Sequence, residues 1–254
     1  PELISFHYRY LTFRNNIKYI YRSDKKIHIN ISRSRILLDS FGYWCIYKPK
    51  DFLCKIDVVF KGEYGTDYGG LTREWITYLV KEFLDPKYGL FVKNENQTYN
   101  LNPETEFNFF NSEYYKMAGA IIALSIIKRT NINAHLSTSL LKQVLQKRID
   151  INDMKEFDES LFNSFQLILN SSDVKPFDLF FSIDESKNGK LNHVNLIENG
   201  DKIQVTNENK SEYVKLYTEY KLVHSISEKV KNFCEGFYSI INIEYIKTPL
   251  HKFV

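Results

Sequence analysis

Four of the chain's ten glycines fall within nine residues: Gly62, Gly65, Gly69 and Gly70. An apolar run, residues 56–60, comes before them. Apolar residues at helical spacing follow them: Leu71, Trp75, Leu79 and Phe83. Glycine is concentrated where a backbone needs a positive φ or must approach another segment closely. The stretch therefore predicts a strand, a glycine-rich loop and a helix, in that order.

Two roles are open to this loop. A phosphate-binding loop would carry its glycines at fixed spacing and open the helix with lysine, but the spacing here fits no such motif and leucine follows the last glycine. Glu63 and Asp67 would also repel an anion. In the structural alternative, Asp67 caps or organises the loop, and Arg73 and Glu74 are buried or half-buried polar anchors of the helix. The residues favour the structural role.

The composition is that of a globular protein with one or two hydrophobic cores, since 43% of the 254 residues are hydrophobic and 15% are aromatic. A net charge of +3 says little about partners. Basic residues in the N-terminal third are interleaved with tyrosine and phenylalanine, a mixture that can bind nucleic acid. An amphipathic helix with a solvated basic face is the favoured explanation, so we expect no nucleic-acid partner.

The cysteines and histidines are scattered, with no paired-ligand spacing. We expect no disulfide framework, no metal site and no cofactor, and an intracellular location in the cytoplasm or nucleus, where thiols stay reduced. Cys54 and Cys234 have the surroundings of buried structural thiols, and no catalytic set of residues stands out. The longest apolar run, residues 117–127, is too short for a membrane span.

The remaining pattern predicts many helices and a few short strands. Helices are expected over about 6–23, 70–84, 111–127, 136–147, 158–169, 207–220 and 226–237. Strands are expected over 27–31, 55–60, 89–91, 99–101, 177–183, 191–196 and 203–205, with Asn199-Gly200 as the turn of the last pair. The fold class is α+β, with a large subdomain over 1–154, a small one over 155–215 and C-terminal helices over 216–254.

An excess of apolar residues marks the small subdomain. Leu161, Phe165 and Ile168 share one helical stripe, and Phe177 and Leu179 alternate along the next expected strand. A subdomain of this size buries only part of its surface, so these side chains could line an exposed groove of the kind that marks a partner site. They could equally form the core, and the residues alone leave both interpretations open.

The glycine stretch has the form Gly-Glu-x-Gly-x-Asp-x-Gly-Gly-x-x-Arg-Glu from Gly62 to Glu74, which resembles a signature of the N-lobe of HECT ubiquitin ligases. Further blocks follow in that family's order: Pro86-x-Tyr88-Gly89-Leu90-Phe91, Leu101-Asn102-Pro103, the segment 198–214, and Gly236-Phe237. The resemblance covers about residues 29–237. Several ordered blocks make it far more specific than one glycine motif.

The resemblance implies a ligase that accepts ubiquitin from a conjugating enzyme onto its own cysteine and passes it to a substrate lysine. In that family the cysteine lies in a separate C-terminal lobe, and none of Cys45, Cys54 and Cys234 matches it. We therefore expect the chain to be an excised N-lobe that ends near the hinge, inactive by itself, with substrates bound through other regions. The alternative is a non-catalytic interaction scaffold that keeps the lobe fold.

The resemblance also places the conjugating-enzyme groove on the small subdomain. Carried over position by position, its residues are Leu161, Phe165, Ile168, Phe177, Leu179 and Tyr213. This favours the groove over the all-core interpretation. The chain departs from the family at Ser171, where an aromatic residue is common, and at residues 119–123, where an arginine is missing.

Overall fold

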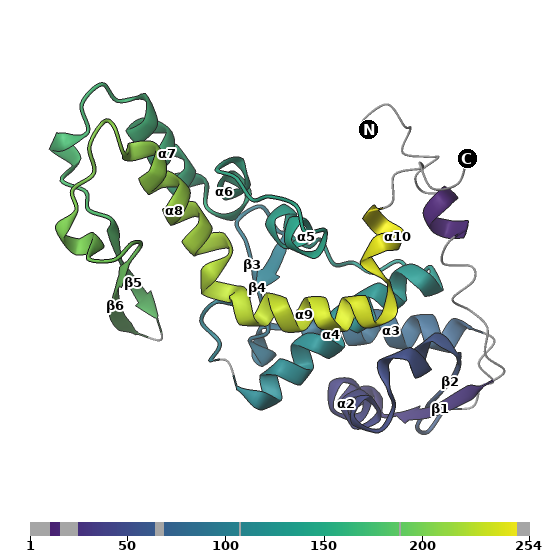
Figure 1. Cartoon of the computed structure of the whole chain (residues 1–254). Coiled ribbons are helices and arrows are strands. Elements are labelled where there is room, and N and C mark those ends of the chain that lie inside the picture. The colour runs from purple at the N-terminus through teal and green to yellow at the C-terminus, as the bar shows by residue number, and fades with distance from the viewer. Residues whose placement is uncertain (1–10, 16–24, 64–68, 107, 188, 248–254) are drawn as a thin grey trace. The chain divides into compact units, whose positions relative to one another are not determined.

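The computed structural model describes residues 11–15, 25–63, 69–106, 108–187 and 189–247. Helices dominate, with three two-stranded sheets among the described residues, so the expected α+β class is confirmed (Figure 1). The chain forms two compact units. The first comprises Pro1–Phe91, Phe107–Ala134 and Glu228–Val254, and the second comprises Val92–Glu106 and His135–Ser227. The subdomain limits expected from the sequence stay a prediction, as does the helix over 6–23, most of which lies outside the described residues.

The first unit begins with a parallel pair of strands, β1 (Lys26–Ile31) and β2 (Lys55–Phe60), joined by α2 (Ile36–Ile46). In both strands every second residue is buried: Ile27, Ile29 and Ile31 in β1, and Ile56, Val58 and Phe60 in β2. This alternation buries one face of the sheet. The strands expected over 27–31 and 55–60 are confirmed.

Helix α3 (Gly70–Phe83) follows the glycine loop, as expected. Its apolar residues Trp75, Leu79 and Phe83 are buried, and the Trp75 indole donates a hydrogen bond to Ser40 Oγ at 2.8 Å. Thr72 Oγ1 donates to the carbonyl of Ile56 at 3.1 Å, which ties the first turn of α3 to β2. Gly69, the residue before the helix, has φ of 98° and therefore needs glycine.

Two long helices, α4 (Phe109–Lys128) and α9 (Ser227–Ile240), pack backbone to backbone (Figure 1). A Cβ atom added at Gly119 would overlap the carbonyl oxygen of Phe233, and one added at Gly236 would overlap that of Lys116. The absence of a side chain at Gly119 and Gly236 thus allows this close packing. The last helix, α10, spans Ile243–Lys247.

The second unit holds β4 (Tyr99–Leu101), which pairs with β3 (Phe91–Lys93), and the helices α5 (Thr138–Val144), α6 (Asn152–Phe157), α7 (Glu159–Asn170) and α8 (Lys210–Leu222). Helices α7 and α8 lie side by side (Figure 1). Its core residues come from most of these elements: Met154, Phe165, Ile168, Val174, Phe181, Val205, Tyr213, Val214 and Leu222.

The strand expected over 177–183 is wrong only at its start, since Phe180 forms an antiparallel bridge with Gln204, and Ser182 and Ile183 begin β5. Lys175–Phe177 is a 3₁₀ turn with Pro176 in its first positions, and Asp178 has φ of 47°, in the left-handed region. Residues 175–178 therefore do not belong to an extended strand. Strand β5 begins later and spans Ser182–Lys187.

The expected pairing of 191–196 with 203–205 is also wrong. β5 pairs antiparallel with β6 (Lys190–Asn195), so the hairpin turn contains Gly189, with φ of 73°. Two Asn-Gly dipeptides lie in this region of the sequence, and the strand pairing ends at Lys187 and Lys190, beside the glycine of the first one. The second opens a 3₁₀ turn, Gly200–Lys202, where a Cβ on Gly200 would overlap the backbone of Phe181.

Candidate functional site: an apolar face of the second unit

The six expected docking residues all belong to the second unit, but their side chains are buried to different extents. Phe165, Ile168 and Tyr213 are core residues, with exposed fractions of 1%, 8% and 4%. Leu161 and Leu179 are half-buried and pack against that core. Phe177 is 36% exposed. The structure therefore brings the first five into one cluster and leaves Phe177 at the surface.

Ring contacts hold this cluster together. Phe165 meets Tyr217 edge to face with centroids 5.2 Å apart, and Phe181 meets Tyr213 in the same way at 5.6 Å. Tyr213 and Tyr217 lie one helical turn apart on α8, with ring centroids 5.9 Å apart. Burial raises the pKa of Tyr213 to about 12, so its phenol stays neutral at physiological pH.

Sequence reasoning missed Tyr217 as part of the site. Its four-residue spacing from Tyr213 places both rings on one face of α8, and that signal could have identified it. Burial is also the main cause that raises the pKa of Tyr217.

Both ends of α7 are held by polar contacts. The Asp158 carboxylate accepts a hydrogen bond from the Leu161 backbone N–H at 2.8 Å and caps the helix. At the other end, Lys210 Nζ donates to the carbonyl of Ser171 at 2.6 Å. This lysine occupies part of the space around Ser171, the position where the family often has an aromatic residue. The contact gives that end of α7 a polar boundary.

Asn207 joins the loop after α7 to the start of α8. Its side-chain oxygen accepts from the Val174 backbone N–H at 3.2 Å, and its Nδ2 donates to the carbonyl of Ser172 at 2.8 Å. These bonds fix the loop that leads into the turn carrying Phe177. Asn207 lies inside the block 198–214, but no pattern in the sequence indicates that this residue positions the loop before Phe177.

The hairpin is fixed to α8 through Glu185 of β5. Its carboxylate accepts from the Tyr220 hydroxyl at 2.6 Å and from Lys221 Nζ at 3.1 Å. Burial, followed by the hydrogen bond to Glu185, raises the pKa of Tyr220. The hairpin, α8 and α7 therefore form one connected framework beneath the apolar face.

The glycine loop lies in the first unit, apart from these residues in the sequence. Gly65 and Asp67 lie outside the described residues. Glu74 is half-buried and accepts a hydrogen bond from Arg33 at 2.7 Å, as expected for a polar anchor. Arg73 is exposed, so its expected burial is wrong, and its contact with the loop stays a prediction.

Arg33 is the residue that the sequence did not reveal in this region. Its guanidinium also binds Glu63, through two nitrogens, and stacks 4.0 Å from the centroid of the Phe60 ring. One arginine thus links the end of β2, the start of the loop and α3. This arrangement supports an architectural role for the loop.

The described residues offer apolar and aromatic contacts, and no group of three or more metal-binding side chains is found among them. Cys54 is buried, and burial raises the pKa of the Cys234 thiol to about 11. A thiol that stays protonated is a poor nucleophile. No helix in the described ranges meets the length and apolarity needed to cross a membrane.

Comparison with known proteins agrees with the resemblance. Residues 77–249 match the HECT-domain (ubiquitin-transferase) family. The chain is 35% identical over 251 residues to the E3 ubiquitin-protein ligase Nedd-4 of Drosophila melanogaster. The aligned region covers 97% of this chain and 25% of that protein. It is 31% identical over 244 residues to the probable E3 ubiquitin-protein ligase TOM1 of Eremothecium gossypii, covering 95% of this chain and 8% of that protein.

A third relative is the E3 ubiquitin-protein ligase RSP5 of Saccharomyces cerevisiae, 33% identical over 216 residues, with 84% of this chain and 27% of that protein covered. The chain thus spans less than a third of the length of each of these relatives. The family match takes in more than half of the chain. The chain belongs to the HECT-domain (ubiquitin-transferase) family.

Proposed function

We propose that this chain is the N-lobe of a HECT ubiquitin ligase and that it docks a ubiquitin-charged conjugating enzyme on the apolar face of its second unit. The docking would position the thioester for transfer to a cysteine in the C-terminal lobe, and then to a substrate lysine. Ubiquitin and substrate proteins are the further partners. The same proposal places the protein inside the cell, in the cytoplasm or nucleus, where conjugating enzymes act.

One observation carries the proposal: Phe177 is 36% exposed beside a core to which Leu161 and Leu179 contribute half-buried side chains. Exposed apolar groups on a rigid support are typical of partner sites. We assign contact with the enzyme to these three residues. Phe165, Ile168 and Tyr213 support the surface from below, so we expect them to act through its shape.

This face is small, so the affinity should be modest, on the order of micromolar, as for transient interfaces of low area. We expect Phe177→Ala to weaken docking by more than about 1 kcal/mol, because a central aromatic side chain at an interface is commonly a hot spot. Titration of the labelled chain with a panel of conjugating enzymes, read by NMR or calorimetry, measures this.

Ile46→Ala is the matched control, because Ile46 is 74% exposed and lies on α2 of the first unit. It removes exposed apolar surface of similar kind and should leave the affinity unchanged. If no enzyme of the panel shifts the resonances of residues 158–181, or if both substitutions weaken binding equally, the docking assignment is wrong.

A further inference from the structure

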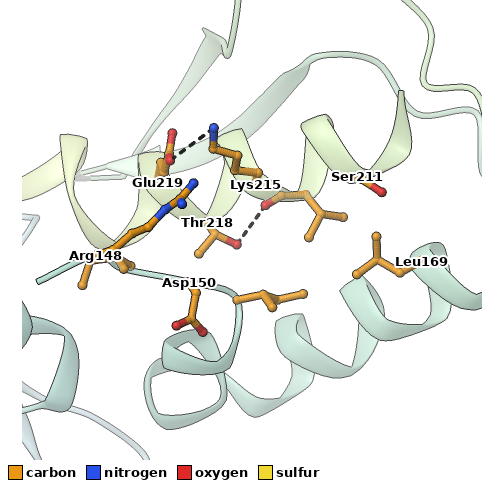
Figure 2. A pocket seen from close by; sticks show the side chains of 10 residues that line it. Arg148, Asp150, Leu169, Ser211, Lys215, Thr218 and Glu219 are labelled. Carbon is orange, nitrogen blue, oxygen red and sulfur yellow. Dashed lines mark hydrogen bonds and ion pairs between the residues drawn. The ribbon is translucent and has the colours of Figure 1, made fainter. Parts of the chain in front are cut away.

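A pocket of about 400 Å³ lies in the second unit, between α8, the end of α7 and the segment 148–151 (Figure 2). None of the six docking residues lines it. Its aliphatic lining comes from Ile149, Ile151, Leu169 and Val214. In Figure 2, Leu169 points from α7 toward α8. A space of this size and lining suits a branched aliphatic side chain.

The charged side chains at the rim of the pocket differ in whether they have ion-pair or hydrogen-bond partners. Lys215 lies 3.9 Å from Glu219, its neighbour on α8. The Asp150 carboxylate accepts from the Asn152 backbone N–H at 2.9 Å and from Lys142 Nζ at 3.2 Å, so both of its oxygens face α5 and α6. Arg148 extends toward α8 in Figure 2 and has no ion-pair or hydrogen-bond partner among the described residues. Its guanidinium is free to bind a carboxylate.

Two hydroxyl groups line the pocket, and they differ in whether they can donate a hydrogen bond to a ligand. Thr218 Oγ1 donates to the carbonyl of Val214 at 2.8 Å, so this buried hydroxyl has no proton left for a ligand. Ser211 is exposed and lines the same pocket, and its hydroxyl makes no hydrogen bond to the described residues. The hydrogen-bond donors open to a ligand are therefore those of Arg148 and Ser211, since Lys215 is paired with Glu219, and an acidic group requires such donors.

The backbone beside the pocket is also open. Residues 147–150 have no regular secondary structure, and the N–H and C=O groups of Arg148 and Ile149 make no hydrogen bond within the described part of the chain. Backbone groups next to an apolar pocket can pair with an extended peptide, while the pocket takes one of its side chains. This feature favours a peptide over a compact small molecule.

We propose that this pocket binds an extended acidic segment of a partner protein, with a branched aliphatic side chain inside the pocket and a neighbouring carboxylate on Arg148. The proposal does not depend on the docking of a conjugating enzyme. Its variants should therefore leave that titration unchanged, so the two proposals can fail separately.

The test uses the whole chain with labelled Ile, Leu and Val methyl groups and three acetylated, amidated pentapeptides. These are Ala-Asp-Leu-Asp-Ala, its lysine analogue Ala-Lys-Leu-Lys-Ala, and Ala-Asp-Ser-Asp-Ala, which lacks the aliphatic anchor. The blocked ends ensure that only side-chain carboxylates can meet Arg148. We expect the first peptide alone, at millimolar concentration, to shift the methyl resonances of Ile149, Ile151, Leu169 and Val214.

Two variants and a control sharpen the result. Arg148→Gln should weaken binding about fivefold, as expected for one exposed charge pair. Ser211→Asp should weaken it similarly by adding a negative charge at the rim, and an acidic residue in the first turn of α8 suits the helix dipole. Lys147→Gln removes the same charge from an exposed neighbour that does not line the pocket, and should change affinity less than twofold.

Equal shifts from the acidic and basic peptides would overturn the proposal, as would equal shifts from the leucine and serine peptides. So would the absence of any shift at these methyl groups. A loss of affinity for Lys147→Gln as large as for Arg148→Gln would show non-specific charge attraction and would overturn it too.

Discussion

Replacing Gly236 with alanine should separate α4 from α9. The new Cβ would lie 2.6 Å from the carbonyl carbon and 2.8 Å from the Cα of Lys116, and real Cβ atoms essentially never approach closer than 3.0 Å. Carbon atoms in contact prefer about 3.5–4.0 Å, so α9 would have to retreat by about 1 Å. Because the obstacle is backbone, no side-chain rotation relieves it.

The cost follows from the packing that this retreat opens. Phe233 and Phe237, on the same helix, are 0% and 5% exposed, and Ala120 and Ala123 of α4 are 2% and 0% exposed. Overpacking costs about 1–3 kcal/mol, occasionally more, and a rigid obstacle belongs at the upper end. Alanine recovers about 1 kcal/mol of helix propensity, so the net loss should be about 2–3 kcal/mol.

Urea unfolding followed by circular dichroism measures this change in free energy of unfolding. Gly42→Ala in α2 is the matched control, since Gly42 is also helical but a Cβ there would meet nothing within 4 Å. It should raise stability by about 0.5–1 kcal/mol. If Gly236→Ala unfolds at the same urea concentration as Gly42→Ala, the backbone contact between α4 and α9 does not have the importance assigned to it.

Three further predictions concern the loop, one lysine and the thiols. Asn207→Ala should lower stability by about 1–2 kcal/mol and weaken conjugating-enzyme docking, because it removes the bonds to Val174 and Ser172 that hold the loop before Phe177; unchanged docking in a calorimetric titration would contradict this. Burial lowers the pKa of Lys128 to about 8, against the opposing effect of Cys54, so the unfolded chain binds more protons between pH 8 and the ordinary lysine value of 10.5. Stability should therefore rise with pH from 8 to 10 relative to Lys128→Met, as urea titrations at several pH values would measure, and parallel pH profiles would refute the burial argument. Incubated with a charged conjugating enzyme, the chain should form no reductant-sensitive ubiquitin adduct through Cys234 on a non-reducing gel, since burial raises the pKa of that thiol to about 11. The assay uses the Cys45→Ser variant, because Cys45 is exposed, and an adduct that is lost on further substitution of Cys234 by serine would refute this.

Local sequence patterns were sufficient to predict the elements whose residues show clear alternation, helical spacing or clustered glycines. The alternation of Ile27, Ile29 and Ile31 predicts a strand with one buried face, and the structure has it. The glycine loop and α3 follow from glycine at a positive φ and from apolar residues at helical spacing. The 177–183 segment misled at its start, because Asp178 takes a left-handed conformation that a polar residue tolerates. After Asp178 the chain is extended, and Phe180 forms an antiparallel bridge with Gln204.

Local sequence patterns also could not predict which of the two Asn-Gly dipeptides lies at the hairpin. Both dipeptides suit a tight turn, and the sequence around Gly200 does not show that Phe181, a residue far away along the chain, needs the space that a side chain would fill. That requirement is a tertiary contact, so only the folded structure reveals it. The antiparallel pairing of β5 with β6 instead ends at Lys187 and Lys190, next to Gly189 with its positive φ.

The apolar stripe on α7 is likewise predicted by local spacing, but the burial of its residues depends on tertiary contacts. Its spacing places Leu161, Phe165 and Ile168 on one face, but their depth depends on Tyr217, which lies about fifty residues later and covers Phe165. The stripe therefore includes both half-buried and fully buried side chains. Phe165→Ala should cost about 3–5 kcal/mol of stability, whereas Phe177→Ala should cost far less, because its side chain is already partly in water.

This difference decides how a loss of binding should be interpreted. If Phe165→Ala abolishes docking and also lowers the melting temperature, the loss reports a deformed support and does not place Phe165 in the interface. Only a residue such as Phe177, whose substitution weakens docking at unchanged stability, identifies a contact. A Phe165→Leu variant, which keeps most of the apolar volume, should restore both stability and docking, and docking that stays lost in this stable variant would place the Phe165 ring itself against the partner.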